Sequence, residues 1–324
     1  MIKTIAIMTS GGDSSGMNPA VRGVVRGALY NNLKVYGIYR GYEGLIDGDI
    51  KELTSRDVGG IINRGGTVLY SARSKKFRTE EGQKQAYENI KKYKIDALVV
   101  VGGDGSLTGL NLFVEKTGIM GMGLPGTIDN DLFGTDYTIG FDTAVNVAMD
   151  AIDKIRDTAT SHERLFLVEV MGRHAGYIAT YCALAGGAEE VLIPETATHI
   201  DALCQKLEEG KKQGKKSSIV VVAEGDEAGG AVEISKKIAG KTDWDVRVSL
   251  LGHMQRGGSP TAFERINASR LGVGAIEGLI AGEKNVMVGI VNDKIVYTPL
   301  KEAISKKKPI NKHYLKTSDI LSSL

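Results

Sequence analysis

Short apolar runs alternate with longer amphipathic stretches along most of this 324-residue chain. Several of the short runs are continuous in Val, Ile and Leu, as in ALVVV at residues 97–101 and IVVVA at residues 219–223. Such runs are typical of strands buried on both faces of a parallel sheet, and the stretches between them are long enough for crossover helices. The pattern predicts an α/β protein with mostly parallel, doubly wound sheets. Strands are expected at residues 4–9, 34–39, 97–101, 121–124, 165–170, 191–194, 219–223 and 246–251, helices at residues 17–30, 80–93, 143–156, 200–213 and 262–281, and a hairpin at residues 288–297.

Size and composition indicate a globular protein that builds its own hydrophobic cores. The length suggests two domains, and 42% hydrophobic with 25% charged residues is ordinary for such proteins. Because 41 Lys and Arg face 39 Asp and Glu, the net charge gives no general attraction to nucleic acid or membrane. A polar start, MIKTIAIMTSGGD, and the lack of a membrane-length apolar run predict a cytoplasmic protein. Cys182 and Cys204 lie outside metal-binding spacings, as expected in a reducing compartment.

A glycine-rich segment follows the first predicted strand and leads into a helix. It reads SGGDSSGMN from Ser10 to Asn18. Glycines let backbone N–H groups approach a phosphate closely, and the start of the next helix favours negative charge. A tight strand-to-helix turn explains the segment equally well, because it matches neither the GxGxxG fingerprint nor the GxxxxGK[ST] phosphate loop.

A second segment of this kind, GGDGS, follows the strand at residues 97–101 and contains Asp104. Asp104 could be only the cap of the next helix. However, a carboxylate among glycines at the end of a buried strand suits a magnesium ion carried by phosphates. Two such loops in one chain favour a nucleotide over two coincidental turns.

A third segment, PGTIDND, places a hydroxyl, an amide and two carboxylates after the strand at residues 121–124. A surface turn could have this composition. Yet phosphoryl transfer to an alcohol needs a carboxylate to accept the hydroxyl proton and charged groups around the phosphates. The three segments together supply phosphate donors, a metal ligand and a base.

These segments, with MGRHAG at residues 171–176 and GHMQRGGSP at residues 252–260, resemble the bacterial ATP-dependent 6-phosphofructokinases. The resemblance extends in order from about residue 2 to residue 300, and PGTIDND and GHMQRGGSP are specific as a pair. It implies two similar doubly wound α/β lobes with the active site in the cleft between them. An ATP-binding lobe is expected at residues 1–140 and 252–303, and a fructose 6-phosphate-binding lobe at residues 141–251 and 304–324.

The resemblance also implies roles for individual residues on the nucleotide side. Gly12 offers its backbone to the transferring phosphate, Tyr42 lies beside the nucleotide, and Asp104 holds Mg²⁺. The ATP-binding residues are expected to be Gly12, Tyr42, Arg73, Ser74, Gly103, Asp104, Gly105 and Ser106.

Catalysis is expected from Asp129, Thr127, Arg173, Arg73 and Gly12. By resemblance, Asp129 accepts the proton of the 1-hydroxyl of fructose 6-phosphate and Thr127 positions the transferred group. Arg173 offsets the charge that develops in the transition state, although a lone arginine is often only a surface ion pair.

The sugar phosphate is expected to be bound mainly by the second half of the chain. His253 and Arg256 bind its 6-phosphate by resemblance, while Arg164 and Arg247 reach the same phosphate from a neighbouring subunit of a homotetramer. Arginine suits this task because its planar fork matches phosphate oxygens. The expected substrate residues are Thr127, Ile128, Asp129, Arg164, Met171, Gly172, Arg173, Glu224, Arg247, His253, Met254, Gln255 and Arg256.

ATP is the expected phosphoryl donor. The related pyrophosphate-dependent enzymes typically carry Asp in place of Gly105 and Lys in place of Gly126. A carboxylate at position 105 would repel the α-phosphate of a nucleotide, whereas glycine leaves room.

The chain departs from the family pattern at two places. Ser15 stands where the family usually has proline. In the expected effector pocket between subunits, for ADP and phosphoenolpyruvate, several positions carry neutral side chains, so weakened control is predicted. The pocket residues are expected to be Arg22, Arg26, Ser55, Gly60, Arg156, Glu189, Gln213, Lys215 and Ser217.

Three other functions share part of this pattern. Related sugar-phosphate kinases share the chemistry. A nucleotide-binding regulatory protein without catalysis should lack Asp129 or Asp104, and both are present. A dinucleotide-dependent dehydrogenase suits the α/β pattern, but its glycine fingerprint is missing.

Overall fold

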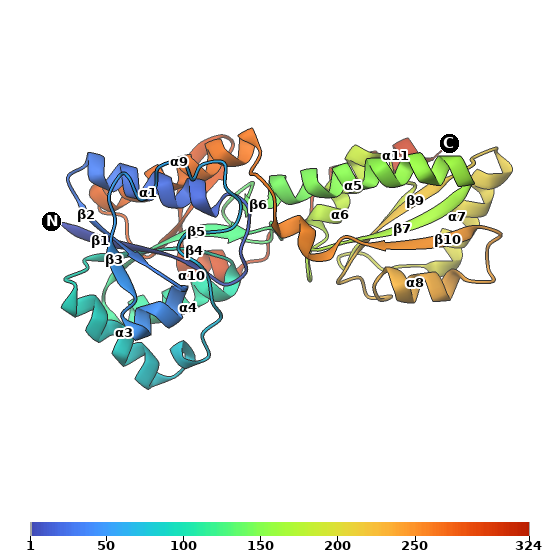
Figure 1. The fold of residues 1–324 in the computed structure, drawn as a ribbon. Helices are drawn as coiled ribbons and strands as arrows, with labels where there is room; N and C mark the ends of the chain where they lie inside the picture. The colour runs from blue at the N-terminus through green and yellow to red at the C-terminus, as the bar shows by residue number, and fades with distance from the viewer. Residues whose placement is uncertain (1, 324) are drawn as a thin grey trace. The chain divides into compact units, whose positions relative to one another are not determined.

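The computed structural model of the chain describes residues 2–323, which form two compact α/β units (Figure 1). The first unit extends to Ile128 and adds Leu132–Thr143 and Arg256–Lys308. The second consists of Asp129–Asp131, Ala144–Gln255 and the segment from Pro309 onward. Each unit is built around its own sheet and contains hydrophobic core of its own.

The first unit contains an eight-stranded sheet in the order β12-β11-β5-β4-β1-β2-β3, with β6 paired to β5. Its inner strands run parallel, while β3 and β12 are antiparallel edges. Asn292 and Asp293 both have positive φ between β11 and β12, as a tight hairpin turn requires, so the predicted hairpin is confirmed. The strands are β1 (Thr4–Ser10), β2 (Lys34–Ile38), β3 (Ile50–Glu52), β4 (Ala97–Gly102), β5 (Met120–Thr127), β6 (Ile139–Gly140), β11 (Val286–Val291) and β12 (Lys294–Pro299).

Helices cover both faces of this sheet, as continuous apolar strands require. Ile5 and Ile7 of β1 pack with α1 and α9 into one core, whereas Ala6 and Met8 contribute to a second core on the opposite face. The alternation of side chains along β1 therefore divides this strand between two cores. The helices of this unit are α1 (Met17–Tyr30), α2 (Gly41–Asp47), η1 (Lys76–Arg78), α3 (Glu80–Lys92), α4 (Asp104–Thr117), α9 (Ala262–Ala281) and α10 (Leu300–Ser305).

The second unit contains a four-stranded parallel sheet in the order β10-β7-β9-β8. Leu165, Leu167, Val220 and Val222 of its central strands pack against α7 and α8. Its elements are α5 (Phe141–His162), which begins in the first unit, β7 (Arg164–Val170), α6 (Tyr177–Gly186), β8 (Glu190–Leu192), α7 (Ile200–Lys212), β9 (Ser218–Ala223), α8 (Ala231–Ile238), β10 (Asp245–Leu250), η2 (Gly252–Arg256) and α11 (Lys312–Ser322).

Most predicted elements are confirmed, and the differences have physical reasons. Helix α5 extends six residues beyond the predicted end at Arg156. Apart from buried Ala159, that last stretch is polar and exposed, and the Thr160 and Ser161 hydroxyls donate to carbonyl oxygens one turn earlier, so no apolar pattern marks it. The predicted strand at residues 191–194 ends at Leu192, before Pro194, which has no N–H to donate. Helix α4 lies outside the helix ranges expected from the sequence, because Gly103 and Gly105 at its start disfavour a helix.

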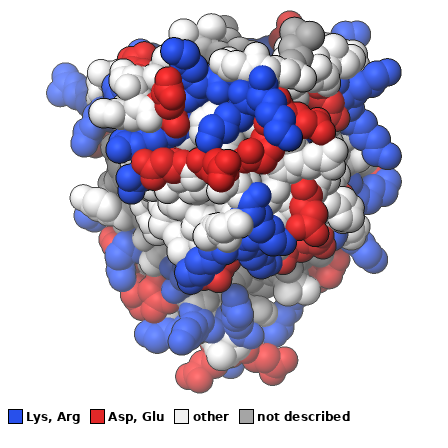
Figure 2. Space-filling view, turned by 90° about the vertical axis from the view of Figure 1, so that its right-hand side faces the viewer, with Lys and Arg blue, Asp and Glu red and all other residues white. Residues whose placement is uncertain are grey.

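The surface mixes charges of both signs. Figure 2 shows basic and acidic side chains interspersed over one face of the molecule, with uncharged residues between them. Among the helices of residues 2–323, none combines the length and apolar character needed to cross a bilayer.

Candidate active site

The three glycine-containing segments lie at the carboxyl ends of neighbouring strands of the first unit. In the sheet register, Ser10 at the end of β1 is paired with Gly102 at the end of β4, and Gly102 is paired with Pro125 of β5. Ligands of open parallel α/β sheets bind at this edge. Segments that are about 90 residues apart in sequence are therefore brought side by side at the expected binding edge.

Side-chain hydroxyls hold the loop after β1 in place. Gly11 has a φ of 87°, which favours glycine, and its carbonyl oxygen accepts a hydrogen bond of 2.6 Å from the Ser71 hydroxyl. The Ser14 hydroxyl donates to the carbonyl oxygen of Ile139 at 2.8 Å. These contacts order the backbone that is expected to meet a phosphate.

The loop after β4 is braced in a similar way. The Ser106 hydroxyl lies 3.0 Å from that of Ser10, which ties this loop to β1. The Tyr42 hydroxyl donates to the carbonyl oxygen of Ser106 at 2.7 Å, and its ring is stacked on Phe77 with centroids 3.9 Å apart. Burial raises the pKa of Tyr42. Tyr42 therefore supports this loop from the protein interior, through its hydroxyl group and its stacked ring.

Asp104 is the first residue of α4 and is exposed. Desolvation by its surroundings nevertheless raises the pKa of its carboxyl group. Among residues 2–323, no cluster of three or more His, Cys, Asp or Glu side chains could form a protein-only metal cage. A single accessible carboxylate beside glycine loops fits the other mode, in which Mg²⁺ is held by one carboxylate, water and the phosphates of a substrate.

Gly105 and Gly126 differ in what their surroundings require. A Cβ atom built on Gly105 would meet nothing within 4 Å, so packing does not demand glycine there. A Cβ on Gly126 would lie 2.9 Å from the Gly102 nitrogen and from Val101 Cγ1, so in this chain a side chain at that position would displace its neighbours. Gly105 is therefore a better indicator than Gly126 of which phosphoryl donor the site binds.

Two other predicted nucleotide residues, Arg73 and Ser74, follow Ser71 in the first unit. The Ser74 hydroxyl accepts a hydrogen bond of 3.1 Å from the Phe77 N–H and thereby begins η1. Arg73 is exposed. Thr127, the last residue of β5, lies beside the second loop, since a Cβ on Gly103 would be 3.3 Å from the Thr127 Cβ.

Arg256 lies over the first glycine loop. Its Nη1 donates to the carbonyl oxygen of Asp13 at 3.0 Å, and a Cβ on Gly12 would lie 2.8 Å from the same nitrogen. By resemblance, Arg256 is expected at the 6-phosphate of the sugar. The structure places it in the unit that contains the expected nucleotide loops.

The carboxyl edge of the second sheet gathers the residues expected to contact the sugar. Val170 of β7 is paired with Ala223 of β9, so Met171 and Glu224 follow neighbouring strand ends. The Glu224 carboxylate accepts a hydrogen bond of 2.8 Å from the Arg173 N–H. Arg173 has a φ of 53°, an uncommon conformation for an arginine that this bond helps to hold. Buried Gln255 lies beside them, 3.4 Å from the Met171 N–H, and the exposed His253 and Met254 precede it.

The tract from Asp129 to Asp131 belongs to the second unit. Asp129 is 6% exposed and Asn130 is 1% exposed, so this is not a solvated surface turn. Asn130 has a φ of 53°. Asparagine adopts this left-handed conformation more readily than most residues, so the chain turns here at little steric cost.

Arg164 and Arg247 converge on one carboxylate that the sequence analysis did not single out. Arg164 Nε and Arg247 Nη2 each lie 2.9 Å from Asp245 Oδ2. Desolvation raises the pKa of Asp245, but the bonds from the two arginines outweigh it and hold that pKa below its ordinary value. The signal was present in the sequence, because residues 245 and 247 of one strand share a face.

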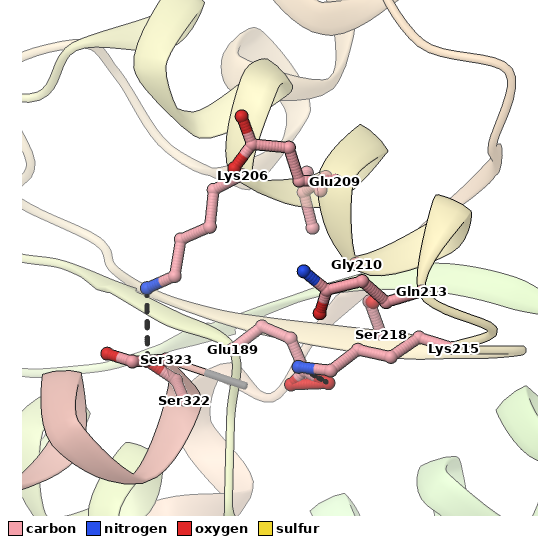
Figure 3. A pocket seen from close by; sticks show the side chains of 10 residues that line it. Glu189, Lys206, Glu209, Gly210, Gln213, Lys215, Ser218, Ser322 and Ser323 are labelled. Atoms are coloured by element: carbon pink, nitrogen blue, oxygen red, sulfur yellow. Dashed lines mark hydrogen bonds and ion pairs between the residues drawn. The ribbon is translucent and has the colours of Figure 1, made fainter.

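A cavity of about 240 Å³ in the second unit contains part of the expected effector site (Figure 3). Lys206 forms an ion pair with Glu190 at 2.8 Å and also donates to the Ser322 hydroxyl, while Lys215 lies 3.7 Å from Glu189. Burial raises the pKa of Glu189 against the opposing effect of Lys215. The lining residues are Glu189, Lys206, Leu207, Glu209, Gly210, Gln213, Lys215, Ser218, Ser322 and Ser323.

The remaining effector candidates are distributed over both units. Arg156 Nη2 donates to the carbonyl oxygens of Gly186 and Gly187, and the Ser217 hydroxyl lies 3.4 Å from that of Thr160. Arg22, Arg26, Ser55 and Gly60 belong to the first unit.

Glu264 is a buried carboxyl group that the sequence did not indicate. It is 3% exposed on α9, and burial raises its pKa to about 8. Its Oε2 lies 3.4 Å from the N–H and the hydroxyl of Thr143, and a Cβ on Gly16 would lie 2.8 Å from its Cγ. Glu264 therefore packs the start of α5 against the first glycine loop.

The predicted site residues thus form two groups. The first unit contains Gly12, Tyr42, Arg73, Ser74, Gly103, Asp104, Gly105, Ser106, Thr127, Ile128 and Arg256. The second unit contains Asp129, Arg164, Met171, Gly172, Arg173, Glu224, Arg247, His253, Met254 and Gln255.

Comparison with known proteins identifies the family. The family model described as Phosphofructokinase matches residues 4–279. The chain is 55% identical over 312 residues to ATP-dependent 6-phosphofructokinase 2 of Bacteroides thetaiotaomicron, covering 96% of both chains. It is 53% identical over 321 residues to ATP-dependent 6-phosphofructokinase 1 of Thermus thermophilus, covering 99% of this chain and 100% of that protein. The chain belongs to the phosphofructokinase family.

Solved phosphofructokinase structures share its architecture. The structure of phosphofructokinase from Saccharomyces cerevisiae superimposes with a TM-score of 0.90 at 36% identity, covering 99% of this chain and 48% of the yeast chain. The chain thus spans about half the length of the yeast phosphofructokinase chain. The predicted fold class and the resemblance stated from the motifs are both confirmed.

Proposed function

We propose that the protein transfers the terminal phosphoryl group of Mg-ATP to the 1-hydroxyl of fructose 6-phosphate, giving fructose 1,6-bisphosphate and ADP. The observation that carries this proposal is the alignment of three motifs at one sheet edge of a phosphofructokinase chain. Relatives with more than half of their residues identical are named ATP-dependent 6-phosphofructokinase. The reaction is the committed step of glycolysis.

Residues of the two groups divide the chemistry between them. Asp129 accepts the proton of the attacking 1-hydroxyl, which is the task of a general base. Thr127 positions the transferred group, and the backbone of Gly12 meets its oxygens. Arg73 and Arg173 offset the charge that develops on these oxygens. Met171, Glu224 and His253 hold the sugar phosphate.

Magnesium is expected to accompany the nucleotide, with Asp104 as its protein ligand. When bound, Mg²⁺ neutralises part of the phosphate charge and orients the phosphates. The accessible carboxylate of Asp104 at the start of α4 supports this assignment.

The open space at Gly105 leads to a test of which phosphoryl donor the protein uses. Because no protein atom lies within 4 Å of a Cβ at this position, a nucleotide phosphate chain has room there. The purified protein should therefore use Mg-ATP and leave pyrophosphate unused in a coupled assay with fructose 6-phosphate. Other hexose phosphates serve as controls for the acceptor. Efficient turnover with pyrophosphate would contradict the donor assignment, and preference for another hexose phosphate would contradict the acceptor.

We further propose a homotetramer in which neighbouring subunits complete each other's sites. Arg164 begins β7, whereas Met171 follows its last residue, Val170. A strand rises about 3.3 Å per residue, so these two positions lie roughly 20 Å apart within one chain. One chain's Arg164 cannot reach a sugar bound at its own Met171, which favours supply from a neighbour. Exposed apolar side chains at helical spacing on α9 also suit association: Phe263, Ile266, Val273 and Ile280.

Control by anionic effectors is expected to be weak. The cavity of Figure 3 has two lysines, but Lys206 already pairs with Glu190 and Lys215 with Glu189. Within this cavity little cationic charge then remains for an anion, so Arg22, Arg26 and Arg156 are the other cations of the expected effector site. Control also requires different affinity for two states. We expect weak inhibition by phosphoenolpyruvate and modest activation by ADP. The measurement is the half-saturating fructose 6-phosphate concentration across a phosphoenolpyruvate titration at fixed Mg-ATP, where a steep rise at low effector concentration would contradict this expectation.

The remaining partners are expected to be small molecules alone. The net charge of +2 gives no general attraction to nucleic acid, and on the face drawn in Figure 2 basic and acidic side chains are interspersed. A glycolytic kinase acts on cytoplasmic metabolites, so we place the protein in the cytoplasm.

A further inference from the structure

Arg164, Asp245 and Arg247 lie on one face of the second sheet, at its amino end. Asp245 begins the edge strand β10 and is paired in register with Arg164, which begins β7. Side chains two residues apart on a strand share a face, so Arg247 lies on the same side of the sheet as Asp245. The three side chains therefore meet at the opposite end of β7 from Met171, the first residue after this strand.

The Asp245 carboxylate holds both arginines through a single oxygen atom. Arg164 Nε and Arg247 Nη2 each lie 2.9 Å from Oδ2, within the range of charge-assisted hydrogen bonds. A guanidinium group has five N–H donors, so each arginine keeps donors for a second acceptor. The arginine side chains are 28% and 51% exposed, which leaves part of each accessible to a ligand.

Two cations share this one anion. Among residues 2–323, Asp245 is the carboxylate that forms an ion pair with Arg164, and it is also the one that pairs with Arg247. The three groups together keep a net positive charge, the sign that attracts an anionic ligand. Without a shared anion, two arginine side chains repel each other and sample many rotamers. A carboxylate that orders both arginines before the ligand arrives removes part of the cost of ordering them on binding.

We propose that Asp245 is a positioning residue that holds Arg164 and Arg247 together for the 6-phosphate of fructose 6-phosphate in a neighbouring subunit. The inference rests on the proposed function, which assigns the two arginines to that phosphate. Asp245 forms no contact with the sugar and acts through the arginines. Its negative charge also repels the phosphate, but the Asp245 side chain is half exposed, so water and salt screen this repulsion. We expect the ordering of the arginines to outweigh it.

Replacing Asp245 with alanine should raise the half-saturating fructose 6-phosphate concentration about 5-fold to 20-fold. Two long side chains must then be ordered on binding, and each costs a factor of about 2 to 10 in affinity. Turnover at saturation and the KM for Mg-ATP should stay within about twofold of the wild type, since the base and the nucleotide loops are unchanged. Asp245→Asn keeps an acceptor oxygen but not the charge, so its effect should be smaller, about threefold. Steady-state kinetics gives these values, and calorimetry gives the fructose 6-phosphate affinity without turnover.

Two controls separate positioning from a general loss of charge or stability. Asp243→Ala removes an exposed carboxylate two residues earlier that pairs with neither arginine, so the half-saturating concentration should stay within about twofold of the wild type. In a chain that carries both Arg164→Ser and Arg247→Ser, Asp245 has no arginine left to hold. Adding Asp245→Ala to that chain should therefore change kcat/KM for fructose 6-phosphate less than about twofold.

Three results with an active wild type would overturn the inference. A lower half-saturating concentration in Asp245→Ala would show that the carboxylate competes with the phosphate instead. An unchanged concentration would mean that the arginines need no positioning. An equal loss in the chain without the two arginines would mean that Asp245 acts on the fold rather than through them. Wild-type binding and turnover are measured in parallel, and a wild type that neither binds nor phosphorylates fructose 6-phosphate would overturn the proposed function and this inference with it.

Discussion

Replacing Asp129 with serine should lower turnover about 10²–10⁴-fold, the usual contribution of a general base. Serine cannot accept the proton of the 1-hydroxyl at neutral pH, while its size leaves the buried surroundings of Asp129 in place. Fructose 6-phosphate should bind with an affinity close to that of the wild type, because the phosphate-binding residues are unchanged. Steady-state kinetics gives kcat and KM, and calorimetry gives the sugar phosphate affinity.

A matched control lies two residues away. Asp131→Asn removes a carboxylate from the same tract, and turnover should change less than about tenfold if Asp129 alone is the base. An Asp129→Ser enzyme with near-normal turnover would exclude this residue as the base.

The carboxyl ends of the strands in both sheets could be predicted because the residues that mark them are adjacent in sequence. A continuous apolar run that stops at glycines and a carboxylate marks where a buried strand meets its ligand. The register that aligns Ser10 with Gly102 then follows from parallel pairing of runs such as residues 97–101. For the same reason, the motif at Asp129 could be recognised before its burial was known.

Contacts between distant side chains could not be predicted in this way. Ser15 and Gly258 are 243 residues apart, and nothing in either segment encodes their hydrogen bond. Likewise, the raised pKa of Glu264 depends on burial beneath α5 and the first loop, although its own sequence reads as an ordinary helix start. Gly126 was interpreted locally, as an indicator of the phosphoryl donor, yet in this chain a Cβ there would also collide with the Gly102 nitrogen and with Val101, a contact that the sequence does not reveal.

The second large effect on turnover is expected from the loss of an arginine that a neighbouring subunit supplies, either Arg164 or Arg247. Both bond Asp245, and Arg164 lies at the amino end of the strand whose carboxyl end precedes Met171. If a neighbour supplies these arginines, an Arg247→Ser chain keeps the base Asp129 in its own site but cannot supply Arg247 to the neighbouring site. An Asp129→Ser chain lacks the base in its own site but still supplies Arg247 to its neighbour. Each variant alone should be nearly inactive at low fructose 6-phosphate.

Mixing the two variants should then restore activity. In randomly assembled hybrids of equal amounts, about a quarter of the sites combine an intact Asp129 with an intact borrowed Arg247, so recovery should approach about a quarter of wild-type turnover. Each variant taken through the same subunit exchange alone controls for refolding, and native mass spectrometry establishes that hybrids have formed. Hybrids without recovered activity would mean that each chain uses its own arginines, which the roughly 20 Å between the ends of β7 argues against.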